Sequence, residues 1–446
     1  MKTPAPPDFE LLIAENRWQD VRELVAPLPP PEVADLLAQV DGPNRLHLYS
    51  VLPRRLRYEV FAHLGNETQQ EIWKSLSDED VKQLLHNLEP DDRTRLLEQL
   101  PEESRERAFS LLTPIEAYGA RQLLAYPEES IGRLMSPEFV AVRAIWTVEH
   151  ALHHIRSQKP APEVITTIYV TDADFKLIDM LELPRFVLAD PETRVEEIMD
   201  GSFVALSPHD DRETAVQAML KYDAVALPVV EREGKLVGVV TVDDVLDVAE
   251  EEATEDFQKQ AAVAPLKAAY LETGVWPLFQ KRIPWLAALV FVYLGASGVI
   301  SAFEEALAAE IVLASFIPLL MGSGGNVGAQ SGTLAVRAIA TGELRGGLWL
   351  RALSKELAVG ALIGATMSLL AAGIGQIRGG YEIAIVVAGA MLLIVVAANI
   401  FGVMLPLLLN KIGVDPAVAG SPLITSFTDV TSLLIYFGLA TQLLGL

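Results

Sequence analysis

Several absences restrict what this chain does. It contains no cysteine, so disulfides and thiolate metal sites are excluded. No nucleotide-hydrolysing motif of the type G-x-x-x-x-G-K-[ST] occurs, and no apolar run near the N-terminus resembles a signal peptide. Histidine is absent from residues 261–446, which removes a preferred zinc and copper ligand from that half. No nucleophile–base pair or metal-hydrolase spacing stands out, so an enzyme is the interpretation that the sequence favours least.

Charge is distributed unevenly along the chain, whose formal net charge is −24. Residues 261–446 carry 9 acidic and 9 basic side chains and are therefore neutral. Residues 1–260 carry the whole excess of negative charge. An acidic, water-soluble half thus precedes a neutral, apolar half. So acidic a segment argues against nucleic acid as a partner and favours cations.

The apolar half contains four charge-free windows and a fifth whose only charge is Asp429, each long enough to cross a bilayer, which takes ~20 apolar residues. They are residues 283–303, 311–336, 357–377, 383–410 and 422–446. Most basic residues of this half fall in segments that would share one side of the membrane: Lys281, Arg282, Arg337, Arg345, Arg351, Lys355 and Lys411. The positive-inside rule then places the acidic half in the cytoplasm and the C-terminus outside. We therefore expect a multi-pass protein of the plasma (inner) membrane, in contact with lipid.

Asp429 is the only charged residue between Asp415 and the C-terminus. An ionised carboxylate in hydrocarbon costs several kcal/mol, so such a residue is a functional-site hypothesis by default. Polar side chains accompany it at spacings of three and four, which place them on one stripe of a helix. These are Ser421, Thr425, Thr428 and Ser432. A polar, negatively charged stripe in a membrane helix suggests a path for cations.

The second window is rich in glycine, at positions 322, 324, 325, 328 and 332, after Pro318. One interpretation is tight helix packing through small residues. The other is a pore lining, because irregular backbone at membrane depth is tolerated where it faces protein or water. Asn326 and Gln330 lie four residues apart on one face and favour the pore lining.

The segment Pro318-Leu-Leu-Met-Gly-Ser-Gly-Gly-Asn-Val-Gly-Ala-Gln330, followed by Asp415-Pro and by Pro422-Leu-Ile-Thr-Ser-Phe-Thr-Asp429, resembles the MgtE family of magnesium channels. The resemblance extends over the whole chain. It implies a homodimer with the ion path along the dimer axis and Asp429 binding the ion in the pore. Asn326 and Thr425 are further pore candidates. Ala329 stands where some relatives carry a polar side chain.

Magnesium chemistry is compatible with this resemblance. Mg²⁺ sheds water reluctantly and is usually held by one or two carboxylates together with retained waters. Two copies of Asp429 facing each other across a two-fold axis would supply that arrangement. A membrane potential of ~100 mV contributes ~4.6 kcal/mol to the entry of a divalent cation, so passive inward flow needs no coupled ion.

The N-terminal part, residues 1–129, contains a 12-residue repeat. Its apolar positions are Leu28, Val40, Leu52, Leu64, Leu76, Leu88, Leu100, Leu112 and Leu124. Turn and cap signals such as Ser77-Asp78 and Pro101-Glu102 follow several of them. Each unit is therefore predicted to form one short helix, and the array to be a helical regulatory domain.

From about Ser130 the pattern changes to short β-branched strands between helices, with strands expected at 164–171, 226–230 and 236–240. Two copies are visible, which resemble a tandem pair of CBS domains over 130–194 and 195–250. The second copy ends in Gly238-Val-Val-Thr241-Val-Asp-Asp244, similar to the element that holds ribose and phosphate in nucleotide-binding CBS pairs. Gly238, Thr241 and Asp244 would then bind ATP or another adenine nucleotide. Plain helix capping is the alternative.

Residues 242–260 form an acid-rich helical stretch, which in most proteins is a solvated charged surface. Here the resemblance implies that residues 251–280 form a connecting helix that plugs the pore domain, residues 281–446. Abundant cytosolic Mg²⁺ would bridge carboxylates, draw the domains together and close the pore. The candidate bridging residues are Asp91, Asp223, Asp244, Asp247, Glu252 and Glu255.

The sequence therefore predicts a multidomain protein with an α-helical repeat domain, α/β tandem CBS domains and an all-α transmembrane domain of five helices. The leading hypothesis is a homodimeric channel that imports Mg²⁺ down its electrochemical gradient and is closed by cytosolic Mg²⁺, which is both substrate and regulator. One alternative is a divalent-cation transporter for Mg²⁺ or Co²⁺ that is coupled to a sodium or proton gradient. Another is a membrane-anchored CBS sensor that transports nothing.

Overall fold

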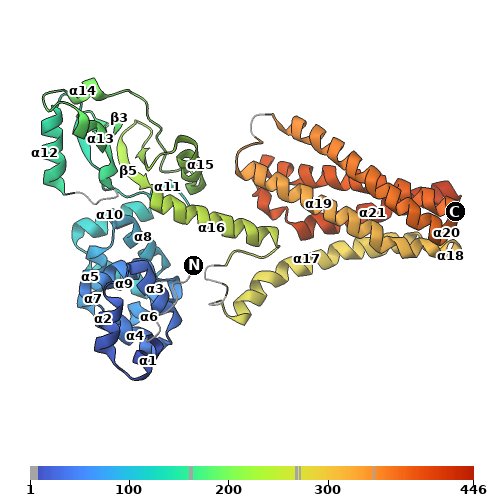
Figure 1. The fold of residues 1–446 in the computed structure, drawn as a ribbon, viewed down its shortest axis with the longest axis horizontal. Coiled ribbons are helices and arrows are strands. Elements are labelled where there is room, and N and C mark those ends of the chain that lie inside the picture. Colours follow the sequence, from blue (N-terminus) through green and yellow to red (C-terminus); the bar gives the residue numbers. More distant parts are fainter. Residues whose placement is uncertain (1–8, 160–163, 267–269, 271–272, 345–346, 446) are drawn as a thin grey trace. The chain divides into compact units, whose positions relative to one another are not determined.

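A computed structural model describes residues 9–159, 164–266, 270, 273–344 and 347–445 (Figure 1). Arg345, part of the expected basic side, and Leu446, the end of the fifth window, lie outside these residues. The chain divides into two compact units, Met1–Glu251 and Glu252–Leu446.

The N-terminal domain is a stack of short helices (Figure 1). They are α1 (Phe9–Ala14), α2 (Trp18–Val25), α3 (Pro30–Gln39), α4 (Gly42–Val51), α5 (Arg54–Ala62), α6 (Asn66–Ser75), α7 (Asp78–Asn87), α8 (Pro90–Gln99), α9 (Glu102–Leu111) and α10 (Pro114–Leu124).

The 12-residue repeat produces one helix per unit, as predicted. The repeat positions Val40, Leu52, Leu76, Leu88, Leu100 and Leu112 are the residues at which successive helices end. Capping residues begin the helices. The Ser77 side chain accepts a hydrogen bond from the Asp80 amide, and Thr113 forms a capping box with Glu116. The repeated apolar residues and the inner faces of the helices pack into one continuous core.

The following region contains two small sheets surrounded by short helices. Its elements are α11 (Ile131–Leu134), β1 (Ala141–Arg143), α12 (Val148–Gln158), η1 (Val164–Thr166), β2 (Thr167–Thr171), β3 (Leu177–Glu182), α13 (Leu183–Leu188), α14 (Val195–Ile198), α15 (Arg212–Tyr222), β4 (Ala226–Val230) and β5 (Leu236–Thr241). In the first sheet β1 pairs parallel to β2, and β2 pairs antiparallel to β3 with Ile168 opposite Leu181. In the second sheet β4 and β5 pair antiparallel.

The strand expected at 164–171 was partly wrong. Val164–Thr166 forms a 3₁₀ turn, and the strand begins at Thr167. Apolar, β-branched composition alone does not distinguish a buried turn from a buried strand. The strands at 226–230 and 236–240 were predicted correctly, although β5 extends to Thr241.

The short helix at the start of each CBS copy packs into the hydrophobic core of the other copy. Ile131 and Leu134 on α11 pack into the core formed by the second copy, where Ser136 also forms a bridge to Val239 of β5. Conversely, Val195 on α14 packs into the core of the first copy. The two copies therefore interlock, and a division of the chain at residue 194 does not follow the division of the packing.

The acidic stretch predicted at 242–260 is one helix, α16 (Val242–Gln260). It is followed by α17 (Val275–Ala302), α18 (Glu304–Ala309), η2 (Ile311–Phe316), α19 (Ile317–Ala340), α20 (Trp349–Lys411), η3 (Pro416–Val418) and α21 (Ser421–Leu444). Helix α16 ends at Gln260, so among the described residues the segment expected at 251–280 to be a connecting helix is helical to Gln260 and again from Val275; residues 267–269 and 271–272 lie outside the described residues.

Within the described residues, four helical segments are long and apolar enough to cross a membrane: Val275–Ala302, Ile311–Ala340, Trp349–Lys411 and Ser421–Leu444. The third covers two of the five predicted windows. Its helical geometry breaks at Gly380, where φ is 78° and ψ is −168°, a conformation that suits glycine. The break separates 349–379 from 381–411, so the described residues contain five candidate membrane segments.

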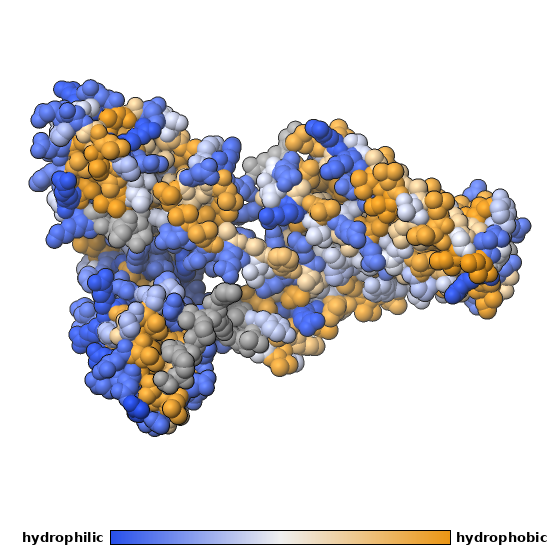
Figure 2. Space-filling model, in the orientation of Figure 1, coloured by the Kyte–Doolittle hydropathy of each residue, from blue (hydrophilic) through white to orange (hydrophobic). Residues whose placement is uncertain are grey.

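Helices α19, α20 and α21 pack closely against one another, and α17 packs against α21 (Figure 1). Their common core includes Leu320, Val387, Ile394 and Phe437. Apolar side chains cover much of the visible outer face of these helices (Figure 2). Phe291 of α17, for example, is 74% exposed. An exposed apolar surface of this kind is suited to lipid.

Candidate functional site

Asp429 lies in the middle of α21 and is only 7% exposed. Among the described residues, no basic side chain forms an ion pair with it. The hydroxyl oxygens of Thr428 and Ser432, on the same helix, are also buried and have no hydrogen-bond partner in the described part of the chain. Unpaired polar groups at membrane depth are costly. The stripe therefore combines a carboxylate with two hydroxyl oxygens, the type of ligand that hard cations prefer.

The glycines of α19 allow it to approach this stripe closely. A β-carbon on Gly324 would lie 2.9 Å from the Ser432 hydroxyl oxygen, and one on Gly328 would lie 3.2 Å from the Thr428 hydroxyl oxygen. Packing through small residues, one of the two interpretations of this segment, therefore accounts for the glycines on this face. Packing through small residues does not account for the polar side chains of α19.

Those polar residues lie on another face of α19. Gly322, Asn326, Gln330 and Thr333 are exposed at spacings of four, four and three, so they form one continuous stripe. Exposed amides do not face lipid hydrocarbon at low cost. The stripe therefore requires contact with water or with another polypeptide.

Thr425, the third predicted pore residue, lies on α21 and is half-buried. Its methyl group is 2.8 Å from where a Gly325 β-carbon would lie.

A buried hydrogen-bond network in this unit was missed in the sequence. Asn399 is 2% exposed, and its amide nitrogen donates to the backbone oxygen of Glu356 at 2.5 Å and to its carboxylate at 2.9 Å. The Ser331 hydroxyl donates to the Asn399 side-chain oxygen. The network links α19 to both segments of α20. An amide within the apolar window 383–410 was the available signal for it.

In the cytoplasmic unit, α8 and α16 bring acidic residues together. The side chain of Arg95 lies among them, 3.3 Å from an Asp244 oxygen, 3.7 Å from Asp247 and 3.8 Å from Asp92. Asp91 is 4% exposed, and one of its carboxylate oxygens has no hydrogen-bond partner among the described residues. Arg95 was not predicted from the sequence. It partly neutralises carboxylates that would otherwise repel one another.

Burial dominates the electrostatics of this acidic cluster. Burial and the nearby charge of Asp244 raise the pKa of Asp91 well above its usual range. Burial raises the pKa of Asp244 to about 6, while Arg95 opposes the increase. A cavity of about 140 Å³, lined by Asp92, Arg95 and Glu251 among others, adjoins the cluster. Added positive charge in this space would stabilise the ionised carboxylates.

The other predicted sensing residues lie elsewhere. Asp223 ends α15 with a left-handed φ of 53°, is exposed, and shares no hydrogen bond or ion pair with the acidic cluster. Glu252 is half-buried on α16. Glu255 pairs with Lys259, whose ammonium also lies 2.5 Å from Asp415. Lys259 therefore fixes the end of α16 to the turn that precedes α21.

The nucleotide motif is partly explained by local structure. The Thr241 hydroxyl donates to Asp244 at 3.0 Å, which satisfies both side chains at the start of α16. A β-carbon on Gly238 would lie 2.7 Å from the Met135 sulfur and 2.8 Å from the Ser136 backbone oxygen. Close packing therefore accounts for this glycine. Among the described residues, no three histidine or acidic side chains already converge as a metal site.

Comparison with known proteins identifies the family. The magnesium transporter MgtE of Thermus thermophilus is 44% identical over 334 residues, which are 75% of this chain and 74% of that protein. This chain belongs to the MgtE family. The magnesium transporter MgtE of Bacillus subtilis is 35% identical over 327 residues, 73% of this chain and 72% of that protein.

Models of three families match successive parts of this MgtE-family chain. The MgtE intracellular N domain matches residues 28–129, the CBS domain matches 195–251, and the divalent cation transporter family matches 317–439. The predicted family and fold class are thereby confirmed. The chain is a multi-pass membrane protein with cytoplasmic N-terminal domains. Its relatives are magnesium transporters, which agrees with a function other than catalysis.

Two solved structures resemble this MgtE-family fold. The crystal structure of the cytosolic domain of the Mg²⁺ channel MgtE in complex with ATP is 36% identical, with a TM-score of 0.52, and the match covers 54% of this chain and 98% of that chain. The crystal structure of the soluble part of a magnesium transporter is 28% identical, with a TM-score of 0.50, and the match covers 55% of this chain and 96% of that chain.

The acidic cluster predicts an unusual dependence of stability on pH. Because Asp244 has a raised pKa in the folded unit, the folded form binds more protons than the unfolded form between about pH 4 and pH 6. The contribution of Asp244 to the free energy of unfolding is therefore largest below pH 4. It decreases by on the order of 2–3 kcal/mol as the pH rises through about 6. Asp91 acts in the same direction.

Thermal unfolding of the full chain in detergent, with a chelator, measures this effect. We expect the unfolding temperature of the cytoplasmic domains to decrease as the pH is raised from 5 to 7. Added Mg²⁺ should increase this temperature more at pH 7 than at pH 5. The Asp244→Asn variant should lose the part of the pH dependence that Asp244 contributes, and the Asp91→Asn/Asp244→Asn double variant should lose most of it. A wild-type unfolding temperature that increases from pH 5 to pH 7 would contradict the assignment of this effect to the raised pKa values of the acidic cluster.

Proposed function

We propose that this protein is a homodimeric channel that carries Mg²⁺ into the cell down its electrochemical gradient. The observation that carries the proposal is Asp429, a buried carboxylate in a membrane helix with no basic partner among the described residues. A hydrated divalent cation replaces the solvation that this carboxylate loses, and Mg²⁺ keeps most of its waters in such sites.

The exposed polar stripe on α19 supports a dimer in which the path lies between two copies. Asn326 and Gln330 would be solvated by water in the path rather than by lipid. A two-fold axis brings the same residues of both copies to one passage. Asp429, Asn326 and Thr425 are the residues proposed to contact the ion or its water. The Ser331–Asn399–Glu356 network holds α19 in the rotation that presents this stripe.

Cytosolic Mg²⁺ is proposed to close the channel. At low Mg²⁺, the carboxylates of Asp91, Asp244 and Asp247 repel one another, and Arg95 only partly compensates. At high Mg²⁺, bound ions favour the form in which these groups are close. An effector shifts such an equilibrium by its differential affinity for the two states, and a few kcal/mol is sufficient.

The end of α16 is the proposed link to the pore. Lys259 connects Glu255 to Asp415, which caps the short η3 turn that precedes the pore helix α21, so a movement of α16 would be transmitted towards that helix. Glu252, which is half-buried, and Asp223, which is exposed, are additional proposed Mg²⁺ ligands. The domains proposed for these roles are residues 1–129, 130–194, 195–250, 251–280 and 281–446.

ATP is a proposed ligand of the CBS pair. The support is the similarity to the ATP complex of a cytosolic MgtE domain, together with the motif of Gly238, Thr241 and Asp244. A nucleotide at this place would contact the start of α16, where Thr241 and Asp244 are hydrogen-bonded. Its phosphates would then alter the charge at the acidic cluster.

Flux into proteoliposomes separates the channel from a coupled transporter. With Mg²⁺ outside, an inside-negative potential set by potassium, and equal sodium and pH on both sides, we expect Mg²⁺ to enter. A potential of ~100 mV contributes ~4.6 kcal/mol for a divalent ion, so no other gradient is required. An ion-sensitive dye inside the vesicles measures the entry.

Vesicles without protein and vesicles without the potential are the controls for leak and for driving force. Entry that appears only when a sodium or proton gradient is added would support the coupled transporter instead. No entry under any gradient, from folded protein, would support a sensor that transports nothing.

A further inference from the structure

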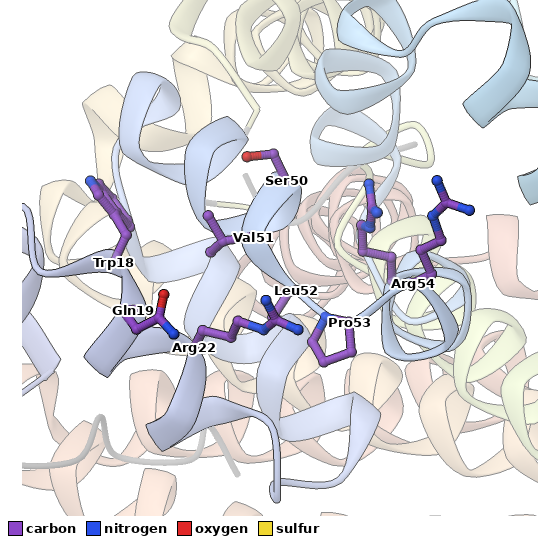
Figure 3. A pocket seen from close by; sticks show the side chains of 9 residues that line it. Trp18, Gln19, Arg22, Ser50, Val51, Leu52, Pro53 and Arg54 are labelled. Carbon is purple, nitrogen blue, oxygen red and sulfur yellow. The ribbon is translucent and has the colours of Figure 1, made fainter.

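The helical domain contains a pocket remote in sequence from the acidic cluster. It lies between the start of α2, the end of α4 and the start of α5, and its volume is about 330 Å³ (Figure 3). This is at the lower end of the range of small-molecule sites, ~300–1,000 Å³. Trp18 and Arg22 line one side, while Ser50, Leu52 and Arg54 line the other, and Arg22 extends across towards Leu52 (Figure 3).

The charge of this pocket is opposite to that of the chain. Three arginines, Arg22, Arg54 and Arg57, line it, and no acidic residue does so among the described residues. None of the three has an ion-pair partner in the described part of the chain. The side-chain nitrogen Nε of Arg57 is buried without a hydrogen-bond partner. In a protein of net charge −24, three guanidinium groups without an acidic partner among the described residues form a local positive patch that attracts anions.

The start of α5 increases the positive potential. Its N-cap is Pro53, which offers no side-chain acceptor, and its first turn contains Arg54 and Arg55 but no acid. The first amide groups of a helix have no partner within the helix, and they favour an anion. Cations at this end are unfavourable unless an anion accompanies them. The guanidinium groups and the helix end therefore favour the same type of ligand.

We propose that this pocket binds a small soluble anion that carries phosphate groups, of the size of pyrophosphate. Guanidinium groups bind phosphate oxygens through paired, charge-assisted hydrogen bonds. Trp18 and Leu52 form an apolar wall. The Ser50 hydroxyl, also in the lining, donates to the backbone oxygen of His47, so the arginines and the helix end supply the donors for the anion. The ligand would join α2 to α5 and remove the repulsion among the three arginines. The pocket would thus add an input to the cytoplasmic unit that is separate from the proposed Mg²⁺ and ATP sites.

Pyrophosphate is the probe, and the full chain in lipid nanodiscs is the target, with a chelator present to remove Mg²⁺. We expect saturable binding in isothermal titration, with a Kd of about 1 mM or below. The double variant Arg22→Gln/Arg54→Gln should weaken binding by about 100-fold, roughly tenfold for each charge-assisted contact. Pyrophosphate should also raise the unfolding temperature of the wild type but not of the double variant.

Arg55→Gln is the matched control. Arg55 lies next to Arg54 on the same helix, but its side chain is 93% exposed and pairs with Glu59, outside the pocket. Its replacement removes a positive charge and should change the Kd by less than about twofold. The unliganded double variant should unfold no earlier than the wild type, because repulsion is removed. Equal binding by all three proteins, or none by the wild type, overturns the proposal.

Discussion

The Asp429→Asn variant is expected to reduce Mg²⁺ influx by about 100-fold or more, which corresponds to ~3 kcal/mol of lost ion stabilisation. Each subunit of a dimer loses one carboxylate, so the passage loses two negative charges at the place where the ion is least hydrated. Asparagine retains the size and one oxygen of the side chain but not its charge. Dye-reported flux in proteoliposomes under an inside-negative potential measures the effect.

Thr431→Val is a suitable control for this experiment. Thr431 lies two residues from Asp429 on α21, but its side chain is exposed, and its hydroxyl donates to the backbone oxygen of Phe427. Its replacement removes a polar group from the same helix at similar depth and should leave flux nearly unchanged. Normal influx by a folded Asp429→Asn protein would remove the basis of the proposed path.

The double variant Asp91→Asn/Asp244→Asn is expected to close only at a cytosolic Mg²⁺ concentration about tenfold higher than the wild type requires. Asp91 is buried and the Asp244 side chain is only 15% exposed, and Mg²⁺ gains more from a charge in a buried site than from one in water. Loss of both removes ~1.4 kcal/mol or more of the preference of Mg²⁺ for the closed form. Patch-clamp recording with graded Mg²⁺ on the cytoplasmic side measures the shift.

Glu102→Gln is the control for this second variant. Glu102 is an exposed acid in the first turn of α9, in the same helical domain. Its neutralisation should leave the Mg²⁺ dependence unchanged, because exposed charges are screened. An unchanged closing concentration in the double variant, with normal pore conductance, would exclude the α8–α16 cluster as the sensor.

Much of the fold was predictable from the sequence because the signals are periodic and strong. The 12-residue spacing from Leu28 to Leu124 predicts one helix per unit, since each unit must bury one apolar face. The charge-free windows predict the membrane segments, because a bilayer requires a minimum apolar length. Errors arose where the chain has no periodicity, as at Val164–Thr166, which forms a turn rather than a strand.

The candidate sites were predictable only in part. A charge in an apolar window is visible in the sequence, so Asp429 could be named as a candidate from the sequence alone. Arg95 was not found, because its role depends on α16 bringing Asp244 and Asp247 within 4 Å of it from more than a hundred residues away. Lys259 was missed for the same reason, since its partner Asp415 lies in another element. Sequence spacing reports neighbours on one helix but not contacts between distant elements.

By itself, the sequence determined the family, the order of the domains and the existence of a lone membrane acid, because these depend on composition, periodicity and local motifs. Only the tertiary structure decided that α11 and α14 exchange places between the CBS copies and that α19 packs its glycines on Thr428 and Ser432 while exposing Asn326. The same is true of the three arginines that meet in one pocket. The reason is physical: burial and charge interactions depend on distance in space, and only folding sets that distance for residues far apart in the chain.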